Sequence, residues 1–209
     1  MEASRICGLL APFMESIRVS SSQIEQISTY LDLLVKWNAR TNLTSIRDPE
    51  EMVRRHFGES LFAAAKLYPS LAGGQETLID FGSGAGFPGI PIKICVPELH
   101  VILIESQNKK ATFLREVIRA LGLKNVDVHV GRAEQSGLTA NTVTMRAVEK
   151  FEQSLPVAAS LVEDGARLAL LIGLAQADRA KSLVPSMHWG EAMRIPESEQ
   201  RILLVGNNR

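Results

Sequence analysis

The sequence contains few cysteines, which limits its redox and metal chemistry. Only Cys7 and Cys95 occur among 209 residues, and neither has a neighbouring histidine at a metal-ligand spacing. We therefore expect free thiols and no metal site. Because the sequence also has no secretory signal and no long apolar run, we expect a cytoplasmic protein without a membrane segment.

An excess of charge of either sign is also absent. The chain carries 23 basic and 23 acidic residues, so its formal net charge is zero. Contact with nucleic acid therefore requires a local basic patch, because the protein as a whole is not basic. With 45% hydrophobic residues, a chain of this length can bury one substantial core. We expect a monomer.

What the sequence does contain is a glycine-rich loop after an apolar, β-branched run. The strand predicted over residues 77–81 includes Asp80 near its end. A loop and a candidate helix follow, with the sequence Gly82-Ser83-Gly84-Ala85-Gly86-Phe87-Pro88-Gly89. Glycine allows close approach of the backbone to a ligand and permits positive φ angles. The pattern favours a cofactor loop over a turn that only joins a strand to a helix.

Two classes of cofactor compete for this loop. Residues 84–89 match G-x-G-x-x-G, the dinucleotide fingerprint. However, Pro88 removes a backbone donor where a pyrophosphate needs one. The carboxylate of Asp80 repels a diphosphate and attracts a cationic amino group or sulfonium. The sequence therefore favours S-adenosylmethionine over a nicotinamide cofactor.

A second acid supports a ligand that contains a ribose. Residues 100–105 predict a buried parallel strand with Glu105 at its carboxyl end. An acid about 20 residues past a glycine loop accepts hydrogen bonds from a ribose diol. The alternative is that Glu105 is an ordinary solvated acid at the end of a strand. Because both classes of cofactor carry a ribose, Glu105 does not distinguish between them.

Strands and helices alternate from residue 76 onward. The predicted strands cover residues 77–81, 100–105, 126–130, 142–146, 166–172 and 201–206. The clearest helix covers residues 109–121, with Gly122 as its cap. Such alternation predicts an α/β fold with a doubly wound, mostly parallel sheet and a ligand beyond its carboxyl ends. Residues 185–196 are predicted to form a loop or an irregular edge strand.

The first part of the chain is predicted to be helical. Apolar residues recur at helical spacing over residues 23–37, and a polar turn is expected at residues 38–42. Asp48 and Pro49 indicate the start of a second helix that continues to about residue 67. Residues 69–75 read as a linker. We therefore divide the chain into an N-terminal helical extension, residues 1–75, and an α/β domain, residues 76–209.

The fourth predicted strand ends in Arg146, which is unusual because unpaired buried charge is costly. One interpretation is an ion pair with a nearby acid such as Glu134 or Glu149. The other is that Arg146 faces the cleft and contacts the cofactor or a substrate phosphate. The two interpretations are compatible.

Several motifs occur together in one order. They are Trp37-Asn38-Ala39-Arg40-Thr41-Asn42-Leu43-Thr44, Arg47-Asp48-Pro49-Glu50-Glu51, Arg55-His56, residues 80–91, Glu105-Ser106, Lys109-Lys110 and Arg146-Ala147. In order and spacing they resemble the bacterial 16S ribosomal RNA guanine-N7 methyltransferases, also called glucose-inhibited division protein B. The resemblance covers roughly residues 30–173.

The resemblance implies a class I S-adenosylmethionine-dependent methyltransferase fold, which is Rossmann-like. It also implies methyl transfer to N7 of one guanine in small-subunit (16S) ribosomal RNA, so the expected partner is that RNA or the small ribosomal subunit. The expected cofactor-binding residues are Asp80, Gly82, Ser83, Gly84, Gly86, Phe87, Glu105 at the ribose, Ser106, Ala133 and Glu134 at the adenine, and Arg146. The expected RNA-binding residues are Arg40, Arg54, Arg55, His56, Lys109 and Lys110.

The implied chemistry requires no catalytic base. N7 of guanine has a lone pair and no hydrogen, so the enzyme has to align it with the methyl group and exclude water. Arg146 is the one candidate catalytic residue. For His56, packing or RNA contact is favoured over proton transfer.

The chain departs from the family at two positions. Ile172 replaces the usual lysine before Gly173, which predicts that a basic group is missing near the cleft, and Glu59 replaces an aspartate. The first change bears on the RNA substrate. The alternatives are methylation of another RNA or a small molecule, a nicotinamide oxidoreductase, and an RNA-binding protein without activity.

Overall fold

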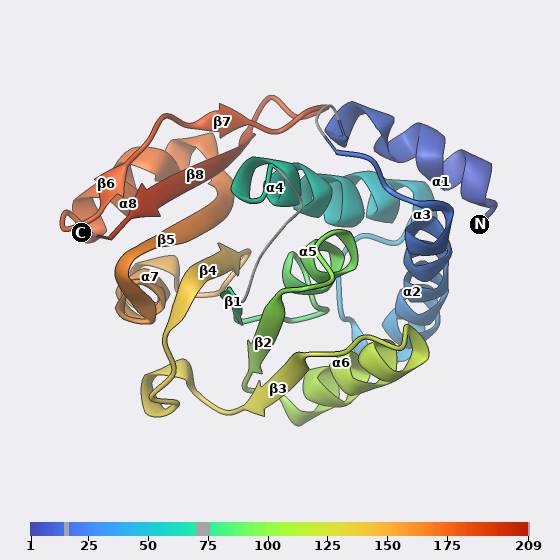
Figure 1. Cartoon of the computed structure of the whole chain (residues 1–209), viewed down its shortest axis with the longest axis horizontal. Coiled ribbons are helices and arrows are strands. Elements are labelled where there is room, and N and C mark those ends of the chain that lie inside the picture. Colours follow the sequence, from blue (N-terminus) through green and yellow to red (C-terminus); the bar gives the residue numbers. More distant parts are fainter. Residues whose placement is uncertain (15–16, 70–75, 209) are drawn as a thin grey trace.

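A computed structural model describes residues 1–14, 17–69 and 76–208. Its centre is a mixed sheet in the order β3-β2-β1-β4-β5-β8-β6, and β7 also pairs with β8 (Figure 1). Strands β1 to β5 are parallel, whereas β8 is antiparallel to β5. The strands are β1 Thr77–Phe81, β2 His100–Glu105, β3 Val126–Val130, β4 Ala140–Arg146, β5 Val162–Gly173, β6 His188–Trp189, β7 Met193–Arg194 and β8 Arg201–Asn207.

Helices cover both faces of the sheet (Figure 1). One apolar core lies between one face and helices α1 to α6, and a second lies between the other face and helices α7 and α8. The α-helices are α1 Ala3–Leu10, α2 Ser21–Thr41, α3 Pro49–Met52, α4 Glu59–Leu67, α5 Gly89–Cys95, α6 Asn108–Ala120, α7 Phe151–Ser160 and α8 Ala177–Leu183. Short 3₁₀ turns are η1 Ala11–Phe13, η3 Ala133–Gln135 and η4 Leu174–Gln176, and η2 Val53–Gly58 is π-helical.

The strand register brings the predicted site residues to one edge. Phe81, the last residue of β1, pairs with Ile104 of β2 and with Met145 of β4. Glu105 and Arg146 follow these partners directly, so both lie beside the start of the glycine loop. All six predicted strands are confirmed, although β4 and β5 begin earlier than predicted.

Three other sequence predictions can be compared with the structure. The prediction of a polar turn at residues 38–42 is wrong, because α2 continues to Thr41. Its C-cap, Asn42, has a left-handed conformation with φ 48°. Most of the predicted linker, residues 70–75, lies outside the described residues. In the tail, β6 and β7 confirm an irregular edge. Within the described ranges, no helix is long and apolar enough to cross a membrane.

Candidate functional site

The glycine loop owes its shape to backbone angles that other residues rarely adopt. Gly82, Gly84 and Gly86 have φ angles of +67°, +56° and +89°, a region in which glycine has no steric penalty. A Cβ at Gly86 would lie 2.5 Å from the hydroxyl of Tyr30 and 2.7 Å from Ile90. Gly86 therefore faces the helical extension, and not a ligand as predicted.

Asp80 also lies elsewhere than predicted. Its side chain is completely buried and accepts hydrogen bonds from the Thr144 hydroxyl at 2.9 Å and from the Gly89 N–H at 3.1 Å. Burial raises the pKa of this carboxyl to about 6, although both hydrogen bonds favour the charged form. Asp80 therefore holds the first turn of α5 and does not present its carboxylate to the cleft.

A cleft of about 450 Å³ lies beyond the ends of the parallel strands, on one side of Gly82. We call it the strand-end cleft. Three of its lining residues are acidic and two are basic. It is lined by Phe81, Gly82, Ile104, Glu105, Ser106, Gly131, Arg132, Ala133, Glu134, Val148, Glu149, Lys150, Gln153 and Ser154.

Glu105 fixes the geometry of the strand-end cleft. One of its carboxylate oxygens accepts from the N–H of Gly84 at 2.9 Å, and the other accepts from the N–H of Gln107 at 2.8 Å. This acid at the end of β2 therefore holds the glycine loop. It also lines the cleft.

A second cleft, of about 500 Å³, lies on the other side of Gly82 and reaches the helical extension. We call it the extension cleft. Four of its lining residues are basic and one is acidic. It is lined by Leu43, Thr44, Ser45, Ile46, Glu51, Arg55, His56, Gly82, Ser83, Gly84, Ala85, Phe87, Lys110, Arg146, Ala147 and Arg201.

Arg146 forms an ion pair with an acid, as one interpretation predicted, but the acid is Glu59 of the extension and not Glu134 or Glu149. Its Nη2 lies 3.3 Å from Oε2 of Glu59 and donates to the carbonyl of Arg55 at 2.7 Å. That carbonyl belongs to the π-helical segment η2, and widened turns of this kind are common at functional sites. Arg146 thus links the end of β4 to the extension.

His56 continues this network as a neutral imidazole. Its Nδ1 lies 3.1 Å from Nη2 of Arg146, which can only donate, so the imidazole proton is assigned to Nε2. Nε2 lies 2.8 Å from the hydroxyl of Thr44. Burial, with the charge of Arg146, lowers the pKa of His56 to about 3. His56 is therefore neutral and joins Arg146 to Thr44 in the wall of the cleft.

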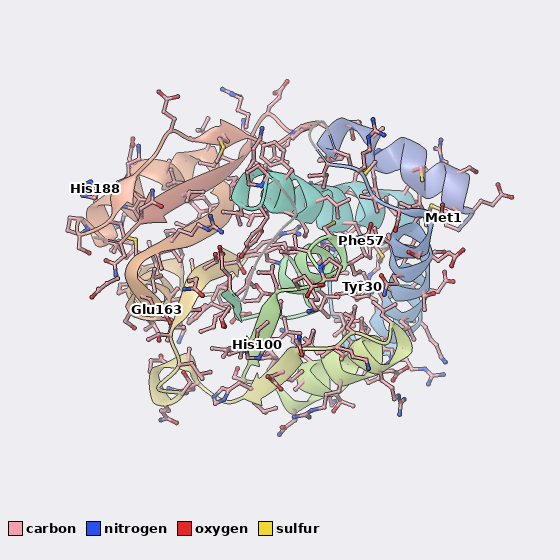
Figure 2. All side chains as sticks on the ribbon, viewed as in Figure 1. Met1, Tyr30, Phe57, His100, Glu163 and His188 are labelled. Atoms are coloured by element: carbon pink, nitrogen blue, oxygen red, sulfur yellow. The ribbon has the colours of Figure 1, made fainter. Side chains whose placement is uncertain are left out.

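An aromatic cluster joins the glycine loop to the extension. The ring of Phe87 stacks on Tyr30, with centroids 5.1 Å apart, and on His56 at 4.8 Å. Tyr30 also meets the edge of Phe57 at 5.1 Å, and Figure 2 shows these two side chains among the helices near the centre of the molecule. The hydroxyl of Tyr30 donates to the carbonyl of Ala85. The extension therefore supports the loop directly.

The predicted RNA-binding residues divide into two groups. Arg55, His56 and Lys110 line the extension cleft. Arg40 and Lys109 are exposed and line neither cleft. Arg54 is engaged by Glu50 and Glu197 at 3.7 and 3.4 Å, which turns it away from both clefts.

Sequence analysis missed three residues that shape the extension cleft: Tyr30, Thr44 and Arg201. Thr44 lies within a motif that carried the resemblance, so a signal for it existed. The side chain of Ile172 is buried in the core beneath α7 and α8, so position 172 does not face the cleft from which a basic group was predicted to be missing. Arg201 of the neighbouring strand β8 supplies a basic group instead.

Comparison with known proteins gives a consistent result. The family model GidB, rRNA small subunit methyltransferase G, matches residues 23–201. The chain is 43% identical over 154 residues to the ribosomal RNA small subunit methyltransferase G of Exiguobacterium sp., covering 69% of this chain and 63% of that relative. It thus spans less than two thirds of that relative's length. Its identity to the protein of that name from Roseiflexus castenholzii is 40% over 202 residues, covering 90% and 85%.

Solved structures confirm the predicted class I methyltransferase fold. Magnesium protoporphyrin IX methyltransferase from Synechocystis PCC 6803 matches with a TM-score of 0.66 and 14% identity, covering 86% of this chain and 97% of that one. The motifs, the fold and the extent of the family match agree: the chain belongs to the rRNA small subunit methyltransferase G family.

Proposed function

We propose that this protein transfers a methyl group from S-adenosylmethionine to N7 of a specific guanine in small-subunit ribosomal RNA. The observation that carries the proposal is that two clefts of opposite charge balance meet at Gly82. Acids predominate in the cleft beside the strand ends, which suits a cationic nucleoside. Bases predominate in the cleft beside the extension, which suits a polyanion.

The strand-end cleft fits the cofactor. Gly82 leaves room beside Val148, because a Cβ would lie 3.0 Å from a methyl group of that residue. Glu105, Ala133 and Glu134 all line this cleft. We assign Glu105 to the ribose diol of the cofactor, and Ala133 and Glu134 to its adenine. Ser106 lines the same cleft, whereas Ser83, Gly84, Phe87 and Arg146, which were also predicted to bind the cofactor, line the extension cleft. S-adenosylmethionine supplies an electrophilic methyl group when bound.

The extension cleft fits the target base. Guanine N7 is a nucleophile without a proton, so the protein has to orient the base, exclude water and tolerate the positive charge that forms on the purine. Phe87 and the fixed network of Arg146, His56 and Thr44 provide an ordered wall for this purpose. Because N7 is inaccessible in regular A-form RNA, the target guanine must leave its helix.

The remaining aspects of the proposal follow from these two clefts. The extension, residues 1–75, supplies one wall of the RNA cleft, and the α/β domain, residues 76–209, holds the cofactor. We also propose that the protein acts as a monomer. The proposed partner is the small ribosomal subunit or its RNA. We therefore place the reaction in the cytoplasm.

The test is transfer of labelled methyl from S-adenosylmethionine to small-subunit RNA and to intact subunits from a strain that lacks this protein. We expect one labelled 7-methylguanosine. Binding of S-adenosylmethionine without incorporation would retain the cofactor and reject the substrate. Methylation of a different RNA or a small molecule instead would support the alternative class of methyltransferase.

A further inference from the structure

One carboxylate faces three arginines at the wall of the extension cleft. Oε1 of Glu59 accepts from Nε of Arg55 at 3.0 Å. Its Oε2 lies 3.3 Å from Nη2 of Arg146 and 3.1 Å from Nη2 of Arg201. Glu59 is only 1% exposed, and both of its oxygens are occupied. This four-residue cluster therefore carries more positive than negative charge.

Arg201 is the member of the cluster with an unsatisfied donor. Its Nε is the only buried side-chain nitrogen or oxygen without a hydrogen-bond partner in the part of the chain that the structure describes. Arg201 contacts Glu59 through Nη2 alone, so the contact is not bidentate and Nε takes no part in it. A guanidinium with free N–H groups matches the oxygens of a phosphate. The cluster is thus suited to a second anion.

The three arginines lie at different depths. The side chain of Arg146 is 7% exposed, that of Arg201 is 21% exposed and that of Arg55 is 40% exposed. Arg201 and Arg55 therefore lie nearer the mouth of the extension cleft. A base that enters this cleft leaves its sugar and phosphates near the mouth.

The position of Arg201 follows from the antiparallel strand at the end of the chain. Arg201 opens β8 and pairs with Gly173 of β5. Directly opposed residues share a face of the sheet, and the neighbouring pair Ile172 and Ile202 points into the core beneath α7 and α8. Alternation along β8 therefore directs Arg201 to the face that the extension covers.

We propose that Arg201, together with Arg55, binds a phosphate of the RNA next to the target guanine. This inference rests on the proposed function, and it gives the C-terminal strand a role in substrate binding. The cofactor's carboxylate is the other oxyanion available to the cluster. The RNA phosphate is favoured because the two arginines lie towards the mouth, whereas Arg146 lies deeper.

The test compares Arg201→Gln with Arg194→Gln, which removes the same charge from an exposed residue of β7. The guanidinium of Arg194 bonds the Glu199 carbonyl at 3.1 Å and lines neither cleft. For Arg201→Gln we expect roughly tenfold weaker binding of small-subunit RNA. The slope of log K against log salt should fall in magnitude by about 0.7 to 0.9. The Kd for S-adenosylmethionine should stay within about twofold of wild type, as should both affinities of Arg194→Gln.

Each other result has a distinct meaning. Equal RNA binding by the two variants would overturn the phosphate contact. An equal loss of affinity for S-adenosylmethionine would assign Arg201 to the cofactor's carboxylate instead. Failure of the wild-type protein to bind or methylate RNA would reject the proposed function itself.

Arg201→Lys covers the case in which Arg201→Gln does not fold. Glu59 would keep a cationic partner in this variant, but the planar fork of the guanidinium would be lost. We expect RNA binding weaker than wild type, with the salt slope retained. Wild-type RNA affinity of Arg201→Lys would rule out a contact that depends on the guanidinium.

Discussion

The two clefts share Gly82 but are built in different ways. The strand-end cleft is lined by residues of the α/β domain alone, most of them just after β1, β2, β3 and β4. The extension cleft draws its wall from the segment after α2, from η2, from the glycine loop and from β8. The first has more acids than bases and the second has more bases than acids. The proposed function thus requires one loop to border two binding sites with opposite electrostatic requirements.

The comparison predicts that the affinities for cofactor and RNA are separable, even by a substitution at Gly82, which lines both clefts. Gly82→Asp should have the largest effect. Gly82 has φ +67°, so a side chain there is strained and meets Val148 at 3.0 Å. We expect loss of detectable S-adenosylmethionine binding and at least about a hundredfold loss of methyl transfer. RNA binding should persist, because several cations carry it. Calorimetry and methyl transfer measure these quantities.

Gly122→Asp is the matched control for Gly82→Asp. Gly122 has φ +63°, no atom lies within 4 Å of a Cβ built there, and it lines neither cleft. The Gly122→Asp variant therefore imposes similar backbone strain without obstructing either cleft. Equal loss of cofactor binding in both variants would mean that strain alone, and not the cleft, explains the result.

Glu105→Gln tests the separation of the two affinities by a change in the strand-end cleft. The amide keeps the shape of the side chain but loses its charge, and its nitrogen cannot accept from the N–H of Gly84 or Gln107, so one of these two hydrogen bonds is lost. We expect about tenfold weaker S-adenosylmethionine binding with unchanged RNA affinity. Glu163→Gln is the control, because Glu163 lies near the start of β5 (Figure 2) and lines neither cleft. A loss of RNA affinity in Glu105→Gln would contradict the separation of the two sites.

The strand-end cleft could be predicted from sequence because its signals are local. The apolar run of β1, the glycines after it and Glu105 at the end of β2 each follow directly from a strand and its loop. The parallel order of the strands then places these loops at one edge. Sequence analysis therefore predicted the fold correctly, and it brought the glycine loop and Glu105 to the same edge of the sheet.

The extension cleft could not be predicted in the same way, because its contacts join distant segments. Arg201 is 142 residues from Glu59, and Arg146 is 91 residues from the carbonyl it binds in Arg55. The wrong prediction for Asp80 has the same origin, since Thr144, which holds its carboxylate, is 64 residues away. Local pattern shows that such residues are polar. It does not show which of them are neutralised by a partner.

Tyr30→Phe tests whether the extension also supports the strand-end cleft, by way of the glycine loop. The change removes the hydrogen bond to the carbonyl of Ala85, and should cost about 1 to 2 kcal/mol of stability. We expect threefold to fivefold weaker cofactor binding, on the order of 1 kcal/mol. Tyr68→Phe is matched, because its buried hydroxyl bonds Thr142 at 3.1 Å, outside both clefts. If both variants lose only stability, the loop does not depend on Tyr30.

The smallest effect concerns pH. The pKa of His56 is lowered to about 3, so its imidazole stays neutral in the folded protein at neutral pH, and methylation of N7 needs no proton acceptor. We expect kcat to show no inflection between about pH 6 and 8 that depends on His56. An inflection near pH 6.5 that disappears in His56→Gln would restore a role for this residue in proton transfer.

The same lowered pKa determines the sign of a stability effect. Below pH 6.5 the unfolded chain protonates His56 while the folded chain does not, so this contribution to stability is lost as the pH falls from 6.5 towards 3. The slope is at most about 1.4 kcal/mol per pH unit. Asp80 acts in the opposite direction, because its raised pKa gives stability that is lost as the pH rises through 6.

Subtracting the unfolding free energies of His56→Gln from those of wild type isolates the histidine, because Asp80 is common to both proteins. Urea unfolding between about pH 4.5 and 7 should show the wild type losing stability relative to the variant as the pH falls. A difference independent of pH would mean that the folded protein protonates His56. Nδ1 of His56 would then carry a proton and could not accept from Arg146 at 3.1 Å. The ordered wall of the extension cleft would therefore depend on pH.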